Sequence, residues 1–271
     1  MRKRSAERPV KINWRKYAIL AASFLTITTL WGLASLSLGE SIFGALLPSP
    51  TTVLIAVFNI LEGRGVIIGG SAMYHVSLTL LRLGFGLALG MIIGTVLGLA
   101  ASRGRLERLF DWPIIIGMSL PTLIIVLMFI AWFHAEDIAA VFAVAAATTP
   151  YVTVNIRDGA KSIDRGIIEM GHIYGANRKL MTWDIFIPNL TPYLFSAARY
   201  AFSLSWKVVT LAEAFGFSGG IGFAVYYNFW MFNQDLMLAW IVIFFMVAIV
   251  IEIALSLIEK RVMIWKPKIT T

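Results

Sequence analysis

Six long apolar runs, each with few or no charged residues, constrain this chain more than any other feature of its sequence. They cover residues 17–38, 76–101, 113–133, 137–156, 193–215 and 236–258. An α-helix of about 20 residues crosses a hydrocarbon core about 30 Å thick. The whole chain is 59% hydrophobic and 14% charged, unlike an ordinary soluble domain. The predicted fold class is therefore all-α, a polytopic membrane protein with six transmembrane helices.

The positions of the basic residues predict the orientation of these helices. Seven of the 23 basic residues precede the first run, most others follow the second, fourth and sixth runs, and the intervening segments carry only Arg64. This alternation is the positive-inside pattern of membrane insertion. Residues 1–16 and 259–271 are thus expected to be cytoplasmic tails. Nucleic acid is not an expected partner, because no soluble module interleaves basic and aromatic residues.

The first run, 17–38, follows a basic stretch, as the apolar core of a signal peptide does. Its length of about 22 residues exceeds the 7–15 residues of such a core, so a retained membrane anchor is favoured over a cleaved leader.

The second run contains four glycines spaced by four residues, Gly86, Gly90, Gly94 and Gly98. This spacing places them on one helical face, where missing side chains allow a second backbone to approach closely. We predict a helix-packing interface there, either within the chain or with a second copy.

Two segments between the runs carry signals of their own. In the predicted periplasmic segment 39–75, Ser49 and Pro50 form a helix-start signal. The apolar stretch after them is too short to span the membrane, so we expect a helix that lies at the membrane surface. Residues 216–235 are rich in aromatic side chains, which suit either a belt at the lipid headgroups or a docking surface for an external partner.

The predicted cytoplasmic loop 157–192 is amphipathic and interrupted at defined points. Apolar residues of 167–174 fit one broad helical face, Gly175 permits a left-handed break, and Asn177 is suited to cap a second short helix. Pro188 is expected to stop that helix before the fifth span begins. Such a unit does not cross the membrane, but it fits along the membrane surface or in the groove of a partner.

This loop reads Glu169-Met170-Gly171, three residues, Gly175, nine residues, Ile185-Phe186-Ile187-Pro188. The order resembles the EAA loop of ATP-binding-cassette importer permeases, which is EAA, three residues, G, nine residues, I, any residue, L, P. The spacing matches throughout, with departures at Met170, Gly171 and Ile187. Other segments are similar to the nitrate/sulfonate/taurine branch of these permeases, namely 47–50, 77–82, 119–121, 212–213 and 265–267.

The resemblance implies a type I importer permease of the bacterial inner membrane, with a five-helix core over residues 76–258. It implies a homodimer that forms the path for a small, anionic solute, delivered by an external binding protein. Two separate cytoplasmic subunits would hold ATP and magnesium, and this chain, which has no phosphate-binding loop motif, would bind no cofactor. The residues implied to couple the chain to the ATPase are Glu169, Met170, Gly171, Gly175, Ala176, Ile185 and Pro188.

Ionisable residues inside the runs are candidates for the translocation path. Lys207 suits an anionic solute if it faces the path, and a structural ion pair is the alternative. Glu213 is expected to bond a loop amide or to pair with Arg82. Ser119 and Pro121 are either pore-lining residues or the site of a simple helix bend.

Two other functional classes fit the sequence less well. An ion-coupled secondary transporter would use Lys207, Glu213 and Glu252 as a charge relay, but no inverted repeat relates the two halves. An intramembrane enzyme would need paired carboxylates or a Ser/His dyad, which are missing. The chain has no cysteine and three dispersed histidines, so no metal site is predicted. The sequence therefore predicts a transport subunit and not an enzyme.

Overall fold

The computed structural model describes residues 14–38, 46–64, 70–134 and 136–262. Its elements are α1 (Trp14–Leu38), α3 (Pro50–Leu61), α4 (Ala72–Ala101), α5 (Gly104–Ser119), α6 (Thr122–Phe133), α7 (Asp137–Lys161), α8 (Arg165–Ile173), α9 (Arg178–Leu180), the π-helix η1 (Met181–Phe186), α10 (Ile187–Gly216), α11 (Ile221–Trp230) and α12 (Gln234–Val262). The described residues include no strand, which confirms the predicted all-α class. Most of the two predicted tails, 1–16 and 259–271, lies outside these ranges.

The described residues provide up to six membrane passages, of which two are bent. Four helices are long and apolar enough to cross a membrane alone, namely α1, α4, α7 and α12. Two helix pairs reach this length only together, Glu107–Ser119 with Thr122–Phe133 at 94° and Arg178–Gly216 with Ile221–Trp230 at 50°. Counting each pair as one passage gives six, the number predicted.

The predicted third run, 113–133, is broken and not a single helix. α5 ends at Ser119, and Leu120 and Pro121 are extended before α6 begins. Pro121 has no N–H to continue the helical hydrogen bonds, and its ring disfavours a helical conformation for the residue before it. The Pro121 carbonyl accepts the N–H of Ile124 at 2.9 Å, which starts α6 in a new direction.

The glycines of α4 pack against α7 along a continuous seam. Gly86, Gly90, Gly94 and Gly98 are all buried. A Cβ atom on Gly94 would lie 2.6 Å from the Cβ of Val152 and 3.0 Å from the carbonyl oxygen of Thr149. The two backbones therefore approach too closely for a side chain on this face. Of the two alternatives left by the sequence, the structure places this seam within the chain.

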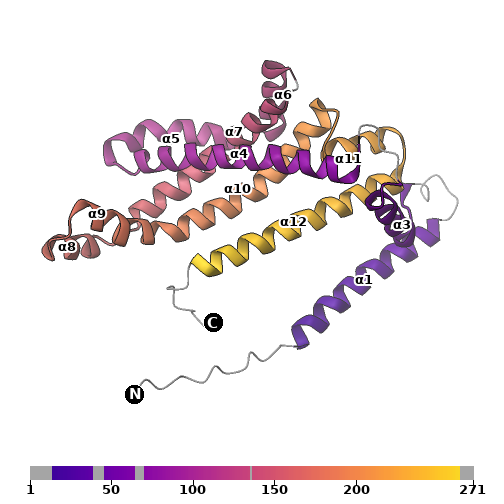
Figure 1. Cartoon of the computed structure of the whole chain (residues 1–271), viewed down its shortest axis with the longest axis horizontal. Coiled ribbons are helices and arrows are strands. Elements are labelled where there is room, and N and C mark those ends of the chain that lie inside the picture. The colour runs from indigo at the N-terminus through magenta and orange to yellow at the C-terminus, as the bar shows by residue number, and fades with distance from the viewer. Residues whose placement is uncertain (1–13, 39–45, 65–69, 135, 263–271) are drawn as a thin grey trace.

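The molecule has two distinct ends joined by one long helix. Figure 1 shows α8 and α9 at one end of the bundle and α3 and α11 at the other. α10 packs against α7 and α4 between these ends. With 30 residues it is about 45 Å long at 1.5 Å per residue. A single continuous helix therefore connects the two ends.

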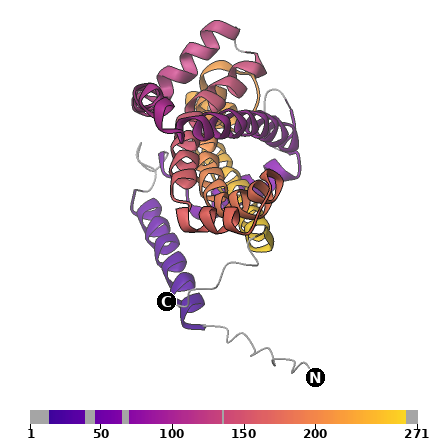
Figure 2. The same cartoon turned by 90° about the vertical axis from the view of Figure 1, so that its left-hand side faces the viewer.

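The N-terminal part of the described chain adds one short and one long helix. The Ser49 side chain accepts the N–H of Thr52 at 3.2 Å and so begins α3, as its sequence signal predicts. α3 buries Val53, Val57 and Ile60 and packs on α12. Figures 1 and 2 both show α1 standing apart from the bundle except near α3. Most of its large apolar side chains are exposed, whereas Trp31 is partly buried and donates to the Pro48 carbonyl.

Candidate functional site

The segment between α7 and α10 folds as a short helical hairpin. The Asp164 carboxylate accepts the N–H of Gly166 at 2.8 Å and begins α8. α8 ends before Gly175, whose φ of +70° is in the left-handed region that favours glycine. The Asn177 side chain then accepts the N–H of Leu180 at 2.9 Å and begins α9. The break and the cap thus lie at the residues that the sequence indicated.

The predicted stop at Pro188 is wrong. α9 continues through η1 into α10, and the N–H of Ile187 bonds the carbonyl of Thr182, five residues earlier. Pro188 has no N–H to donate, and the chain changes there from π-helical to α-helical bonding instead of ending. The proline lies in the first turn of α10, directly after the π-helical turn, where the hydrogen-bonding pattern changes. The helix of the fifth passage consequently begins before residue 193.

Gly171 explains how the two arms of the hairpin pack. It is buried, and a Cβ atom there would lie 2.6 Å from the Met181 sulfur and 2.9 Å from the Ile185 side chain. The N–H of Ala176 bonds the Gly171 carbonyl at 2.9 Å. A small residue at this position therefore lets α8 lie directly on η1.

Exposed apolar side chains occur on both arms of the hairpin. Ile173 and Tyr174 are 83% and 84% exposed, and Trp183 is 62% exposed. Met170 is half-exposed, and the neighbouring Glu169 is exposed. Apolar surface of this kind, next to polar residues, marks a contact with a protein or a membrane.

The base of the hairpin is fixed to two other helices. The Ser162 hydroxyl donates to the Tyr193 hydroxyl at 2.7 Å, which joins the end of α7 to α10. Arg157 pairs with Asp111 of α5 at 2.9 Å, and Lys161 pairs with Glu107. The hairpin is thus mounted on α5, α7 and α10 together.

A second polar assembly lies at the opposite end of α10, and we call it the Arg82 cluster (His75, Thr79, Arg82, Asp137 and Glu213). Nη1 of Arg82 donates to Glu213 at 3.0 Å and to the Gly219 carbonyl at 2.7 Å. Nε and Nη2 donate to Asp137 at 2.8 and 2.6 Å. The Glu213 carboxylate also accepts the N–H of Gly222 at 2.9 Å. Both bonding partners expected for Glu213 are present.

Three members of this cluster were missed by sequence reasoning. His75 and Thr79 are completely buried, and Asp137 begins α7. The signal for the first two was available, because residues 75, 79, 82 and 86 share one face of α4 and lead into its glycine seam. Asp137 had no such signal, since its position opposite Arg82 depends on how α7 packs.

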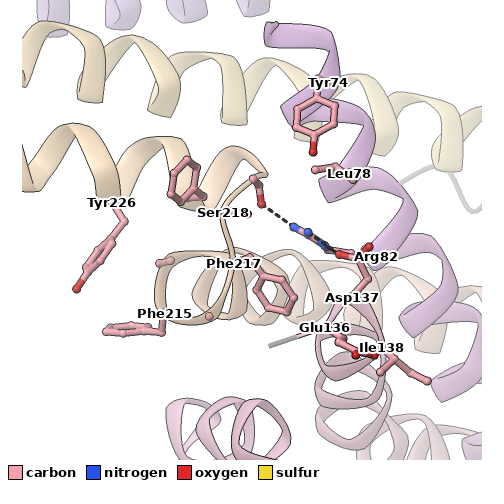
Figure 3. Close-up of a pocket in the computed structure, with 14 residues that line it drawn as sticks. Tyr74, Leu78, Arg82, Glu136, Asp137, Ile138, Phe215, Phe217, Ser218 and Tyr226 are labelled. Atoms are coloured by element: carbon pink, nitrogen blue, oxygen red, sulfur yellow. Dashed lines mark hydrogen bonds and ion pairs between the residues drawn. The ribbon is translucent and has the colours of Figure 1, made fainter. Parts of the chain in front are cut away.

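A cavity of about 880 Å³ opens beside the Arg82 cluster. Figure 3 shows Arg82, Asp137 and Glu136 on one side of it and aromatic side chains, including Phe217 and Tyr226, around the rest. The Arg82 guanidinium lies 4.4 Å from the centre of the Phe217 ring. Glu213 is fully buried and does not line this cavity.

Lys207 faces away from the Arg82 cluster. Its side chain is exposed near the middle of α10 and forms no hydrogen bond or ion pair with any residue that the structure describes. It lines a cavity of about 330 Å³ between α10 and α12. About two turns nearer the hairpin, Arg199 pairs with Glu252 at 3.4 Å and with Glu259 at 2.5 Å. Glu252 lines the same cavity as Lys207, whereas Glu213 lies in the Arg82 cluster, so no direct hydrogen bond or ion pair joins these three residues in the described structure.

Ser119 and Pro121 lie exposed at the break between α5 and α6. The Ser119 hydroxyl donates to the Ile115 carbonyl of its own helix at 2.8 Å. Neither residue lines the cavities beside Arg82 or Lys207. Their observed contribution is the 94° bend.

Comparison with known proteins gives a family match over most of the chain. Residues 86–264 match the family described as "Binding-protein-dependent transport system inner membrane component". The chain is 27% identical over 242 residues to the putative aliphatic sulfonates transport permease protein SsuC of Escherichia coli, covering 89% of each chain. It is 23% identical to the taurine transport system permease protein TauC of the same organism, covering 94% of each. The nitrate import permease protein NrtB of Synechococcus elongatus is 24% identical over 78% of this chain and 75% of its own.

Solved structures share the fold. A chain of the MetNI methionine ABC transporter in an inward-facing conformation aligns with a TM-score of 0.57 at 19% identity, covering 78% of this chain and 96% of that chain. A chain of an amino acid ABC transporter aligns with the same TM-score over 69% of this chain and 92% of that chain.

Proposed function

The chain belongs to the family of binding-protein-dependent transport system inner membrane components, and from this membership we propose how it is energised and what passes through it. It is a multi-pass permease subunit of an ABC importer. We assign ATP and magnesium to two separate ATP-binding subunits and delivery of solute to an external binding protein. Two copies of this chain form the path.

The hairpin is the proposed contact with the ATPase. The observation that carries this assignment is the group of exposed apolar side chains on α8 and η1, next to Glu169. An amphipathic helix with such residues fits a groove on a partner. Gly171, Gly175, Ala176, Ile185 and Pro188 shape the hairpin, whereas Glu169 and Met170 are free to contact the partner.

Charge supports an orientation in which the hairpin lies in the cytoplasm. Basic residues occur around the hairpin, after α4 and at the end of α12, and the positive-inside pattern places such segments on the cytoplasmic side. α3, α11 and the Arg82 cluster then lie at the outer side of the membrane.

We propose a small anion as the solute and Lys207 as a residue of its path. An unpaired ammonium group within a membrane passage is costly unless water or a ligand solvates it. The similar proteins named for sulfonates, taurine and nitrate handle compounds that carry an anionic group, which agrees with a fixed positive charge at this depth. Because Glu213 is buried and fully bonded, it is assigned a structural role and not a place on the wall of the path.

Reconstitution tests both parts of the proposal. The chain is placed in liposomes with its ATPase and binding protein, and uptake of labelled nitrate, an aliphatic sulfonate and an uncharged sugar is measured with and without ATP. We expect ATP-dependent uptake of an anion. Uptake by this chain alone that follows an ion gradient and ignores ATP would instead indicate a secondary transporter.

Lys207→Met tests the anion path in the same assay. A charge-assisted hydrogen bond contributes about 1.5–3 kcal/mol, so uptake of the anion should fall about tenfold or more, while Lys207→Arg keeps most of it. Unchanged uptake in Lys207→Met would remove Lys207 from the path without affecting the importer assignment.

A further inference from the structure

The first turn of α11 is capped by side chains from two other helices. The N–H of Gly220 donates to Nδ1 of His75 at 3.0 Å, that of Ile221 to the Thr79 hydroxyl at 2.9 Å, and that of Gly222 to the Glu213 carboxylate at 2.9 Å. Helices ordinarily satisfy these free N–H groups with a local cap or with water. Gly220, at the cap position, has no side chain to do so. Three consecutive donors are therefore held by α4 and α10.

The buried charge of Glu213 at this contact is compensated by donors within the protein. Glu213 is completely buried, and a buried carboxylate is unfavourable unless it is paired and hydrogen-bonded. Arg82 and Thr79 both donate to it, and the positive end of the α11 helix dipole faces it. Removing one donor would leave a buried charge or N–H group incompletely satisfied.

The backbone geometry allows little freedom at this contact. Gly220 has a φ of +116°, and a Cβ atom there would overlap the Glu213 carboxylate. A Cβ atom on Gly222 would collide with the backbone of Thr210 in α10. The loop before α11 thus rests directly on α10. The His75 ring is held between aromatic side chains, with its centroid 6.1 Å from that of the Phe223 ring and 5.6 Å from that of the Trp240 ring.

We propose that His75, Thr79 and Glu213 are positioning residues that clamp the first turn of α11 to α4 and α10, so that the outer end of the path moves as one body with α10. α10 is one helix from the hairpin to Glu213, and the clamp passes its displacement to α11. This inference rests on the proposed importer function, because it concerns how a movement begun at the ATPase reaches the opposite side.

Thr79→Val is the most direct test. It preserves the shape of the side chain but removes the hydroxyl that donates to Glu213 and accepts from Ile221. Thr153→Val is the matched control, because Thr153 is also buried and its hydroxyl bonds only the Thr149 carbonyl of its own helix. The chain has no cysteine, so Ser218→Cys, an exposed position in the loop before α11, introduces a single reporter thiol.

The reporter is labelled with a membrane-impermeant maleimide in liposomes that contain the complete transporter, either without nucleotide or with ATP and vanadate. In the Thr153→Val background we expect the two labelling rates to differ at least about threefold. In the Thr79→Val background we expect the labelling rates without nucleotide and with ATP and vanadate to be equal within about twofold. ATP hydrolysis should be retained, and uptake should fall about tenfold, the loss expected for an unsatisfied buried group.

Two results would overturn the clamp. One is a Thr79→Val protein whose labelling and uptake match the control. The other is labelling that does not depend on nucleotide in the control while uptake is driven by ATP. Because ATP-driven uptake by the control is measured in the same liposomes, failure of the clamp is distinguishable from failure of the importer assignment. His75→Leu, which removes the acceptor for Gly220 alone, should repeat the Thr79→Val pattern if the clamp acts as a unit.

Discussion

Replacing Gly94 by alanine tests how closely α4 and α7 must approach. The added Cβ atom would lie 2.6 Å from the Cβ of Val152 and 3.0 Å from the Thr149 carbonyl, where ordinary contacts are 3.4–4 Å. The helices would have to separate locally by roughly 1 Å, and overpacking of this kind costs about 1–3 kcal/mol. Alanine also gains about 1 kcal/mol of helix propensity over glycine. We therefore expect a net loss of about 1 kcal/mol in the free energy of unfolding.

Gly84→Ala is the matched control in the same helix, because nothing lies within 4 Å of a Cβ atom there. It should leave the free energy of unfolding unchanged or slightly higher. Both variants are unfolded reversibly with sodium dodecyl sulfate in mixed micelles and followed by tryptophan fluorescence. Adding Val152→Ala to Gly94→Ala should recover part of the loss, since it removes the nearest colliding atoms. Indistinguishable Gly84 and Gly94 variants, or strict additivity with Val152→Ala, would refute the close-packing argument.

The hairpin gives three further expected outcomes. Glu169→Lys should leave the chain folded and inserted, because the side chain is exposed. Substrate-stimulated ATP hydrolysis by the reconstituted complex should nevertheless fall about tenfold. Full stimulation would count against docking of the hairpin on the ATPase. Gly171→Val should reduce the same stimulation by pushing α8 off η1, while Gly166→Ala, whose Cβ atom meets nothing closer than 3.4 Å, should resemble the native chain. Pro188→Ala should change the free energy of unfolding by no more than about 0.5 kcal/mol; a loss above 2 kcal/mol would show that the proline is needed to shape η1.

Local signals in the sequence predicted local structure well. The four-residue glycine spacing identified the packed face of α4, and Ser49, Gly175 and Asn177 mark helix boundaries in the structure. Each of these residues acts on backbone atoms only a few positions away. Their effect is therefore visible without knowledge of the rest of the fold.

The two prolines at helix junctions share one physical property, although only the stop at Pro188 was predicted wrongly and the bend at Pro121 was one of its two expected roles. Pro188 and Pro121 both lack a backbone N–H. At Pro188 the helix continues by changing from π-helical to α-helical hydrogen bonding, whereas at Pro121 the new helix α6 begins at 94° to the helix before it. Which outcome occurs depends on whether neighbouring helices hold the flanking segments in line. Proline alone indicates a local weakness and not the angle that results.

The Arg82 cluster was predictable only in part. The pairing of Arg82 with Glu213 was expected because both are charged groups in apolar runs, where a partner is required. His75 and Thr79 are ordinary residues by composition, and their importance arises from the backbone N–H groups of α11 that they bond. Those donors come from residues more than 140 positions later in the chain, and only the fold brings them together.

The π-helix η1 lets the chain hold one additional residue between the hairpin and α10 without turning one relative to the other. A π-helical segment holds one residue more than an α-helix of the same turns, and one residue corresponds to about 100° of rotation about the axis. Deleting one residue within 181–186 would let the chain return to α-helical bonding over the same number of turns, so the hairpin would keep its orientation relative to α10. A one-residue deletion within the α-helical part of α10 has no such additional residue to absorb it, and it would turn Trp183 and its exposed neighbours by about 100° relative to the far end of α10.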